Sequence, residues 1–260
     1  MLKIVRTFAK DRLQCSFMQA VLDLAQAFAL DGFAVVPGFL SPAWLLRLQQ
    51  AVETVAAMGA ALTSDTVIQG AKFQVQTASG RPGDEAVAPG VFRKIMFAHK
   101  VSRDFRAFRS DSCWRAPLHA LGIAAPRCVL DQINYKVARV GTGFPWHQDA
   151  YFVPPARQAA IANFGGANTV IALDAADAAN GAFGVIPGSH RRGPVAFDYD
   201  LGAPDGAAFE AAGAVVLDMA PGDAVFFHPY LLHASARNRS ERARRMLTYW
   251  WIANGSGKAH

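Results

Sequence analysis

The chain has 260 residues, of which 52% are hydrophobic and 18% are charged, and its formal net charge is +6. This composition is that of a globular protein with one sizeable core, and it excludes disordered and fibrous classes. The basic residues form no stripe interleaved with aromatics, and no apolar run is as long as a membrane span, so we expect neither nucleic acid nor a membrane as partner.

The cysteines and the N-terminus bear on the compartment. Cys15, Cys113 and Cys128 match no disulfide or zinc spacing, which predicts free thiols in a reducing compartment. The first dozen residues are basic but lack the apolar core and cleavage site of a secretory signal. We therefore expect a cytoplasmic protein.

Helical signals dominate the first half of the chain. Apolar residues recur at helical spacing over 17–31, and the run 33–40 predicts a short strand that ends in a turn. Ser41 and Pro42 are typical of the start of a second helix, because serine caps free amides and proline suits the first turn. One or two short helices are expected within 105–121.

From about residue 126 the pattern changes to short apolar runs separated by turn signals. The runs are CVLDQINYKV, FPWHQDAYFV, NTVIALDA, GAFGVIPGS, AVVLDM, DAVFFHPYLLHAS and RMLTYWWIA. Such spacing predicts an antiparallel barrel or sandwich. We expect a mostly β fold with helices, in which a double-stranded barrel core (about 126–253) is packed by a helical N-terminal part (about 1–125). No repeat or second domain is evident, so 1–260 is predicted to be one domain.

A candidate metal site begins with His147 and Asp149. Side chains two residues apart in a strand share a face, so both can point at one ion. Two histidines and one carboxylate, with open positions opposite, suit non-haem iron(II) that must bind oxygen; zinc accepts the same ligands but does not activate oxygen. A His-x-Asp pair alone is a weak signal, and the surrounding Trp146, Tyr151 and Phe152 strengthen it.

Three histidines are candidates for the second imidazole. His190 lies in a PGSH turn, where a histidine that hydrogen-bonds the loop is an equally good interpretation. His228 and His233 are five residues apart and face opposite sides of a strand, unless the strand is broken at Pro229. The residues alone leave this choice open.

Arg244 is the candidate anion-binding residue. It follows His233 by eleven residues, so a hairpin would bring it back beside that histidine on the next strand. Its planar guanidinium can hold a carboxylate through two hydrogen bonds. Its place at the start of an apolar strand indicates partial burial, and a buried cation needs a fixed anionic partner.

Four segments of the chain together resemble the phytanoyl-CoA dioxygenase family of iron(II)- and 2-oxoglutarate-dependent oxygenases, over roughly residues 30–252. They are WHQDAYF, ANGAFGVIPGSH, GDAVFFHPYLLHAS and NRSERARR, and their order and spacing agree with the family. The resemblance implies a jelly-roll (double-stranded β-helix, cupin-like) core. It implies that His147, Asp149 and His233 are the iron ligands, and that Arg244 holds the distal carboxylate of 2-oxoglutarate.

The resemblance also implies further cosubstrate contacts. Ser235, two residues after the distal histidine, is similar to a serine that helps bind that carboxylate in relatives such as ectoine hydroxylase. Asn134, Phe144 and Thr169 fall where such relatives place other cosubstrate contacts. Lys94, in FRKIM, is similar to a lysine that binds cosubstrate or substrate, although a surface lysine is an equally good interpretation.

The activity implied is hydroxylation of an unactivated C–H bond of a small-molecule metabolite, with O2 as oxidant and decarboxylation of 2-oxoglutarate to succinate. Desaturation, cyclisation, epoxidation or epimerisation on the same centre is the main alternative. A non-catalytic binding barrel and a zinc-dependent cupin-like enzyme are the others. Related halogenases lack the carboxylate ligand, so the presence of Asp149 argues against halogenation.

The substrate is less defined by the sequence. Loops at 60–98, 153–166 and 191–212 are expected to determine specificity, and 76–90 has the composition of a lid. Arg191 and Arg192 are candidates to attract an anionic substrate at the mouth. We expect an anionic or zwitterionic small molecule, such as an amino acid derivative, a phosphonate, a quaternary amine or a secondary-metabolite intermediate. The protein is expected to be a monomer or a homodimer.

Overall fold

The computed structural model describes residues 15–80, 84–195 and 212–253. The helices are α1 (Cys15–Asp31), α2 (Pro42–Ala57), α3 (Arg103–Arg109), α4 (Arg115–Ala120) and α5 (Pro155–Phe164), with 3₁₀ turns η1 (Ala98–Lys100), η2 (Ser112–Trp114), η3 (Asp149–Phe152), η4 (Ala178–Asn180) and η5 (Ser189–Arg192). The strands are β1 (Phe33–Val36), β2 (Thr66–Ile68), β3 (Ala71–Val75), β4 (Phe92–Met96), β5 (Pro126–Lys136), β6 (Phe144–His147), β7 (Gly166–Ala172), β8 (Phe183–Val185), β9 (Val215–Leu217), β10 (Ala224–Phe227), β11 (His233–Ser235) and β12 (Arg244–Ala253).

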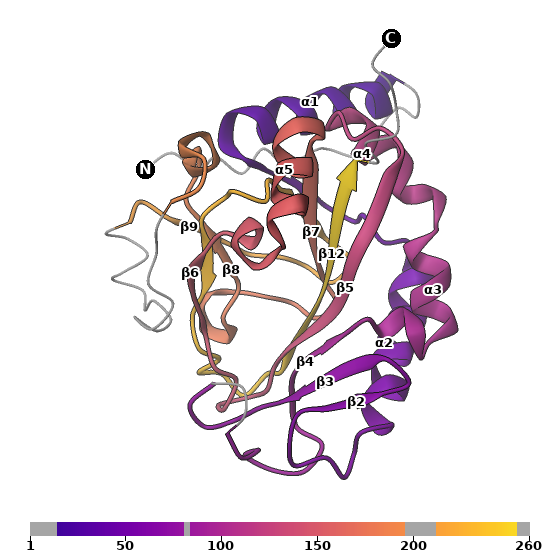
Figure 1. Cartoon of the computed structure of the whole chain (residues 1–260), viewed down its shortest axis with the longest axis vertical. Helices are drawn as coiled ribbons and strands as arrows, with labels where there is room; N and C mark the ends of the chain where they lie inside the picture. The colour runs from indigo at the N-terminus through magenta and orange to yellow at the C-terminus, as the bar shows by residue number, and fades with distance from the viewer. Residues whose placement is uncertain (1–14, 81–83, 196–211, 254–260) are drawn as a thin grey trace.

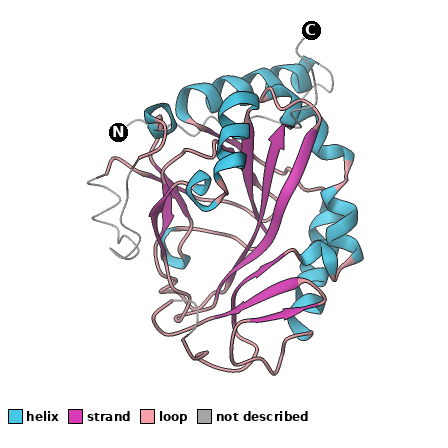
Figure 2. Cartoon of the chain, in the orientation of Figure 1, coloured by secondary structure: helices cyan, strands magenta, loops and turns pink. Residues whose placement is uncertain are grey.

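The strands form two antiparallel sheets. The large sheet has the order β1-β10-β7-β12-β5-β4-β3-β2, and the small sheet has the order β6-β11-β8-β9. Figures 1 and 2 show the small sheet on one side of the long strands β5 and β12, with α2 and α3 on the other side. This arrangement is the predicted jelly-roll with flanking helices.

The two faces of the large sheet have different roles. On β12, Leu247, Tyr249 and Trp251 belong to the main core beneath the helices. Met246, one residue out of phase, packs instead toward the small sheet with Phe227 and Val185. Because side chains alternate along a strand, the same strand therefore supplies both the structural core and the wall of the space between the sheets.

Most predicted elements are observed, and two differences matter for the site. The short strands β2, β3 and β4 extend the large sheet, so the part before residue 126 is not only helical. The run DAVFFHPYLLHAS is two strands, β10 and β11, which lie in different sheets.

At the second helix, the Ser41 hydroxyl accepts a hydrogen bond from the Trp44 amide at 3.2 Å, as a cap should. No helix in the described ranges has the length and apolarity needed to cross a bilayer.

Candidate metal centre

His147 and His233 are brought face to face by the small sheet. His147 is the last residue of β6, His233 is the first residue of β11, and the two are register partners. Their ring centroids are 4.1 Å apart. Asp149 lies outside the strand, at the start of η3, so strand alternation alone does not place it. Gln148 still has extended backbone (φ −116°, ψ 129°), which returns Asp149 to the side of His147.

Hydrogen bonds to the backbone orient both imidazoles. Nδ1 of His147 donates to the Pro145 carbonyl at 2.7 Å, and Nδ1 of His233 donates to the Leu231 carbonyl at 2.9 Å. The Nε2 atoms then face Asp149 Oδ1 at 3.6 Å and 3.5 Å. One potential ligand atom from each of the three residues lies within 4.8 Å of the others. Fixing Nδ1 in this way selects the tautomer that a metal bound at Nε2 requires.

The charge state of the cluster also suits a metal. Burial, together with the neighbouring His233, lowers the pKa of His147 and favours the neutral imidazole. Burial acts to raise the pKa of Asp149, but the two imidazoles outweigh it and hold that pKa below its usual range. Neutral histidines and an ionised carboxylate are the forms that bind a cation.

Asn168 is a site residue that the sequence did not reveal. Its Nδ2 donates to Asp149 Oδ2 at 2.6 Å, which leaves Oδ1 directed at the imidazoles. Asn168 lies on β7, in a strand whose residues are all buried. An amide side chain in a fully buried strand is the signal that points to such a role, because a buried amide needs a polar partner.

Replacing Asn168 with alanine is expected to weaken metal binding by roughly tenfold to a hundredfold, because a ligand whose outer hydrogen bond is lost is no longer held in place. Thr169→Val is the matched control. Thr169 is fully buried and its Oγ1 has no hydrogen-bond partner among the described residues, so valine should leave metal affinity unchanged. Titration with Mn²⁺ or Zn²⁺ followed by calorimetry measures both; equal losses in the two variants would contradict this role of Asn168.

Arg244 is buried at the edge of the same cavity. The residue is 4% exposed, and its Nε has no hydrogen-bond partner among the described residues. Burial lowers the pKa of its guanidinium to about 9. Ser235, at the end of β11, lines the cavity with it. A buried cation without a carboxylate partner is costly, so this position favours the binding of an anion.

A second buried cation, Lys136, lies beside Arg244 and was not anticipated. It is the register partner of Arg244 on β5. Its Nζ donates to the carbonyls of Thr142 at 3.2 Å and Ser235 at 3.4 Å, and also to that of Ala236. Burial holds the pKa of Lys136 well below its usual range. Lys136 thereby ties the end of β11, which carries Ser235, to β5.

Phe144 lies among three cations. Arg93 has no register partner on β3, because Lys94 pairs with Gln74 and Phe92 pairs with Val75. Such a β-bulge changes the direction in which the neighbouring side chains point. Arg93 Cζ is 4.1 Å from the Phe144 ring centroid, Lys94 Nζ is at 5.3 Å, and Lys136 Nζ is at 5.6 Å. Burial, followed by the adjacent Arg93, lowers the pKa of Lys94 to about 8. Of these basic residues, Lys94 lines the same end of the cavity as Arg244.

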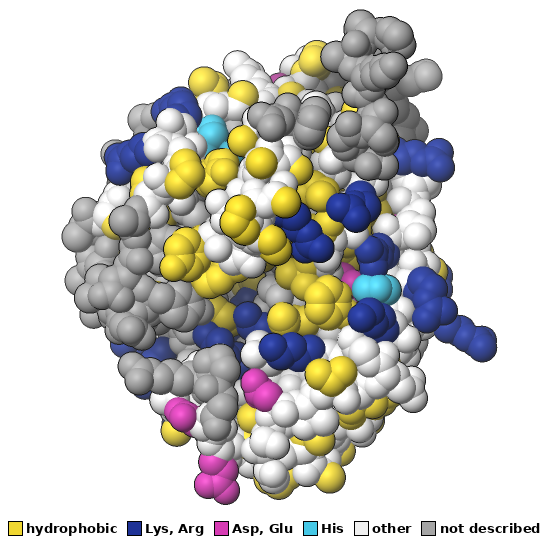
Figure 3. Space-filling model, in the orientation of Figure 1, with side chains coloured by type: hydrophobic (Ala, Val, Ile, Leu, Met, Phe, Trp, Pro, Cys, Tyr) yellow, Lys and Arg dark blue, Asp and Glu magenta, His cyan; other side chains and the backbone are white. Residues whose placement is uncertain are grey.

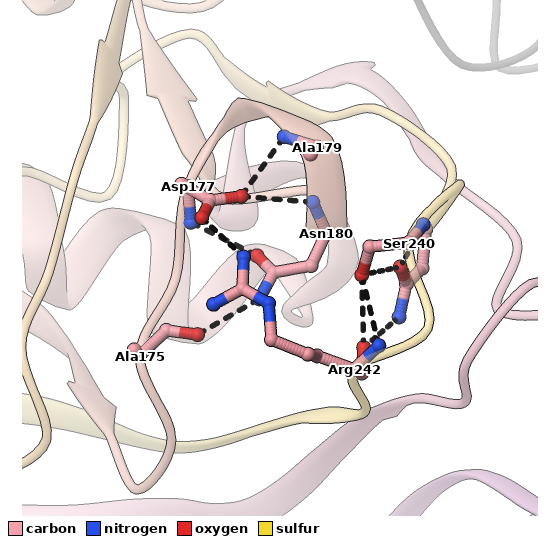
Figure 4. A network of polar contacts seen from close by, with 7 residues as sticks. Ala175, Asp177, Ala179, Asn180, Ser240 and Arg242 are labelled. Atoms are coloured by element: carbon pink, nitrogen blue, oxygen red, sulfur yellow. Dashed lines mark hydrogen bonds and ion pairs between the residues drawn. The ribbon is translucent and has the colours of Figure 1, made fainter.

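Beyond Arg244, a polar network holds the chain that enters β12 (Figure 4). The Asp177 carboxylate caps η4 through the amides of Ala179 and Asn180, at 3.0 Å and 3.2 Å, and pairs with Arg242. The side-chain Nδ2 of Asn180 donates to the Ala175 carbonyl at 2.8 Å. The Asp177–Arg242 pair therefore ties η4 to the chain two residues before Arg244, where β12 begins.

The cavity between the sheets has a volume of about 380 Å³. Of the predicted cosubstrate contacts, it is lined by Lys94, Asn134, Phe144, Ser235 and Arg244. Thr169 is not among its lining residues; its β7 neighbours Asn168 and Val170 face the site, so Thr169 is directed to the opposite face of the sheet. A cosubstrate contact by the Thr169 side chain is therefore not supported by its position.

Other predicted residues lie away from the cavity. His190 and His228 pack on each other with ring centroids 5.3 Å apart, and His190 Nε2 donates to the Ala29 carbonyl at 3.3 Å, so both are structural. Phe152 lines the cavity but Trp146 and Tyr151 do not. Arg191 and Arg192 lie in η5 and do not line it either. The predicted segment 191–212 lies largely outside the described residues.

A jelly-roll with two histidines and one carboxylate converging between its sheets defines a cupin-like protein with a candidate mononuclear metal centre. Residues 28–246 match the phytanoyl-CoA dioxygenase (PhyH) family. This match covers most of the chain, which therefore belongs to that family.

Curated relatives match over part of their length. The chain is 36% identical to methylphosphonate hydroxylase of Gimesia maris over 127 residues, which are 48% of this chain and 45% of that protein. It is 31% identical to peroxisomal phytanoyl-CoA dioxygenase of Rattus norvegicus over 126 residues, which are 40% of this chain and 32% of that protein. The chain thus spans about a third to a half of these relatives.

Solved structures agree with the fold. EctD from S. alaskensis, solved with 2-oxoglutarate and 5-hydroxyectoine, superposes with a TM-score of 0.64 at 24% identity, over 88% of this chain and 74% of that one. The carbocyclase SnoK from nogalamycin biosynthesis gives a TM-score of 0.66 at 15% identity, over 89% and 83%.

Proposed function

We propose that this protein is an iron(II)- and 2-oxoglutarate-dependent dioxygenase that hydroxylates an unactivated C–H bond of a small molecule while 2-oxoglutarate is converted to succinate. The observation that carries the proposal is the pairing of two features in one cavity. The first is a set of three donors, His147, Asp149 and His233, with both Nε2 atoms directed at one carboxylate oxygen. The second is Arg244, a buried guanidinium whose Nε lacks a partner among the described residues.

The residues present fit the iron. His147, Asp149 and His233 would hold it, and the donor set leaves positions open for a cosubstrate and for oxygen. Iron(II), when bound there, supplies the activation of dioxygen. The protein's own contribution is to hold these ligands in the correct tautomer and charge state, through the carbonyls of Pro145 and Leu231 and the amide of Asn168.

The cationic end of the cavity fits 2-oxoglutarate. Arg244 and Ser235 would bind its distal carboxylate, and Asn134 and Lys94 line the same cavity. Phe144 provides an apolar wall along the chain of the cosubstrate. Two basic residues at this end of the cavity, Lys94 and Arg244, favour a dianion over a neutral ligand, and this argues against a zinc hydrolase that needs no such cosubstrate.

Hydroxylation is proposed over the other reactions of such a centre because sequence relatives named as hydroxylases match this chain, and the presence of Asp149 argues against halogenation. We propose in addition that the whole chain works as one domain, since one hydrophobic core joins residues of α1, β4 and β12, and that it acts in the cytoplasm as a monomer or homodimer.

The test is a screen of small molecules with protein prepared anaerobically, loaded with iron(II) and 2-oxoglutarate, and then exposed to labelled dioxygen. The proposal predicts that a true substrate stimulates succinate formation and gains one labelled oxygen atom. A substrate that stimulates succinate but loses only two hydrogens would show desaturation or cyclisation instead. A metal content of zinc, with turnover that needs no oxygen, would refute the proposal.

A further inference from the structure

Side chains on the inner face of the large sheet are ordered from charged to apolar along the cavity. The register pairs Arg244 with Lys136, Met246 with Asn134, Thr248 with Gln132, and Trp250 with Leu130. Each step of two residues advances the strand by about 7 Å, so the last pair lies about 20 Å along β12 from the first. The cavity therefore has a cosubstrate end at Arg244 and a distant end at Trp250.

The distant end is apolar. The residues that line it are Met96, Phe97, Val129, Leu130, Phe152, Val153 and Trp250. Phe152 is 48% exposed and contacts His147 edge-on, with ring centroids 5.6 Å apart. Its ring therefore lies at the mouth of the cavity, with one side against a metal ligand and the other in solvent. Figure 3 shows hydrophobic side chains gathered near the centre of this face, with Lys and Arg side chains around them. An exposed apolar hollow of this kind is typical of a binding site.

Arg157 is the one charged residue among the described residues that line this apolar end. It is exposed on α5, and no hydrogen bond or ion pair involves its side chain in the described structure. Its guanidinium is thus available to an anionic group of a ligand that occupies the apolar end.

Phe97 provides a rigid wall of the same end. Its backbone is left-handed (φ 60°, ψ 40°), a conformation that a bulky residue adopts only when its surroundings enforce it, and such strain concentrates at functional sites. The Phe97 amide donates to the Asp131 carbonyl at 2.7 Å, and the His99 amide donates to the buried Asp131 carboxylate at 3.0 Å. Asp131 therefore holds the turn that presents Phe97 to the cavity.

We infer that the substrate is an anion with an extended apolar body, in which the body lies between Phe97 and Trp250 and the anionic group meets Arg157. This inference rests on the proposed function, since it assumes that the Arg244 end is filled by 2-oxoglutarate. A small zwitterion such as an amino acid presents too little apolar surface to fill the distant end. A body held between Phe97 and Phe152 lies beside the metal ligands, where a C–H bond of its chain can react.

The test measures binding to the full chain loaded with iron(II) and 2-oxoglutarate under nitrogen, by calorimetry. Decanoate is apolar and anionic, and decanamide differs from it only in being neutral; the third probe, L-proline, is a small zwitterion. Decanoate should bind about tenfold more tightly than decanamide, because a charged hydrogen bond to Arg157 adds to the same apolar contact. Proline should not bind measurably.

Variants locate the contacts. Arg157→Met should remove the preference for decanoate over decanamide, whereas Arg103→Met, an exposed arginine of α3 that does not line the cavity, should keep it. Phe97→Gly, which suits the left-handed backbone, should weaken both apolar probes several-fold without loss of folding. A preference for decanoate that survives Arg157→Met, or tighter binding of proline than of decanoate, would overturn the inference.

The two proposals fail separately. Each probe is also titrated into protein without iron and 2-oxoglutarate. If decanoate then binds at the cosubstrate end, its affinity falls in Arg244→Met relative to the wild type. If 2-oxoglutarate itself does not bind, the proposed function fails. If 2-oxoglutarate binds and the probes show no preference that depends on Arg157, only the inference about the substrate fails.

Discussion

Replacing Asp149 with alanine is expected to reduce iron(II) binding to less than roughly one tenth of the wild-type affinity, and to abolish oxygen-dependent succinate formation with it. The carboxylate is the only anionic member of the cluster, and its Oδ1 faces both imidazoles, at 3.6 Å and 3.5 Å. Without it, two neutral histidines remain, and two uncharged ligands make a weak site for iron(II).

Thermal unfolding gives an independent measure of the same change. A ligand that binds only the folded state raises its stability, so added Mn²⁺ should raise the melting temperature of the wild type and leave that of Asp149→Ala unchanged. Asp104→Ala is the control, because this aspartate lies on α3 in an exposed pair with Arg47. A metal-dependent rise in Asp149→Ala equal to that of the wild type would exclude Asp149 as a ligand.

Replacing Arg244 with methionine is expected to raise the 2-oxoglutarate concentration for half-saturation by at least about thirtyfold, since removing one partner of a buried charge pair costs about 2–5 kcal/mol. Iron(II) affinity should change little, because Arg244 is not a ligand. Lysine at this position should restore only part of the affinity, as it cannot offer two parallel hydrogen bonds.

The adjacent residue provides a matched control. Arg245 is directed to the other side of β12, where it pairs with Asp174 at 2.7 Å and also with Glu53. Arg245→Met should therefore lower the stability of the fold by up to about 1 kcal/mol, after allowance for partial exposure, and leave the 2-oxoglutarate requirement unchanged. If both variants raised that requirement equally, the effect would be one of folding and not of an anion contact.

Parts of the fold could be predicted because they follow from local pattern. The apolar runs after residue 126 correspond to strands, and Ser41 does cap a helix. The strands β2 and β3 carry no comparable signal, since they are short and their stability comes from pairing with β4 in the large sheet. Such pairing joins residues distant in the sequence, which local propensity does not record.

The site shows the same division. His147 and Asp149 are recognisable from their spacing, whereas the choice between His228 and His233 depended on where the chain breaks between β10 and β11. Asn168 and Lys136 act through contacts with distant segments, at Asp149 and at the carbonyls of β11. Thr169 was predicted as a cosubstrate contact but does not line the cavity, because a shift of one residue in a strand moves a side chain to the other face.

The residues predicted from the sequence to contact the substrate differ most from those that line the cavity. Arg191 and Arg192 do not line the cavity, while Arg157, within the predicted specificity segment 153–166, does. Nothing in the sequence ranks one exposed arginine above another, because the cavity wall combines η3, α5, β4 and β5. The apolar lining of its distant end is the reason to prefer a substrate with an apolar body over a small polar metabolite.

The most direct test of the central claim is an anaerobic titration of iron(II)-loaded protein with 2-oxoglutarate, followed by visible absorbance. A weak charge-transfer band should develop and should saturate with one equivalent of cosubstrate bound. The band should be absent in Asp149→Ala and should require a much higher 2-oxoglutarate concentration in Arg244→Met than in Arg245→Met. A wild-type protein that binds iron(II) fully yet develops no band at any 2-oxoglutarate concentration would contradict this claim.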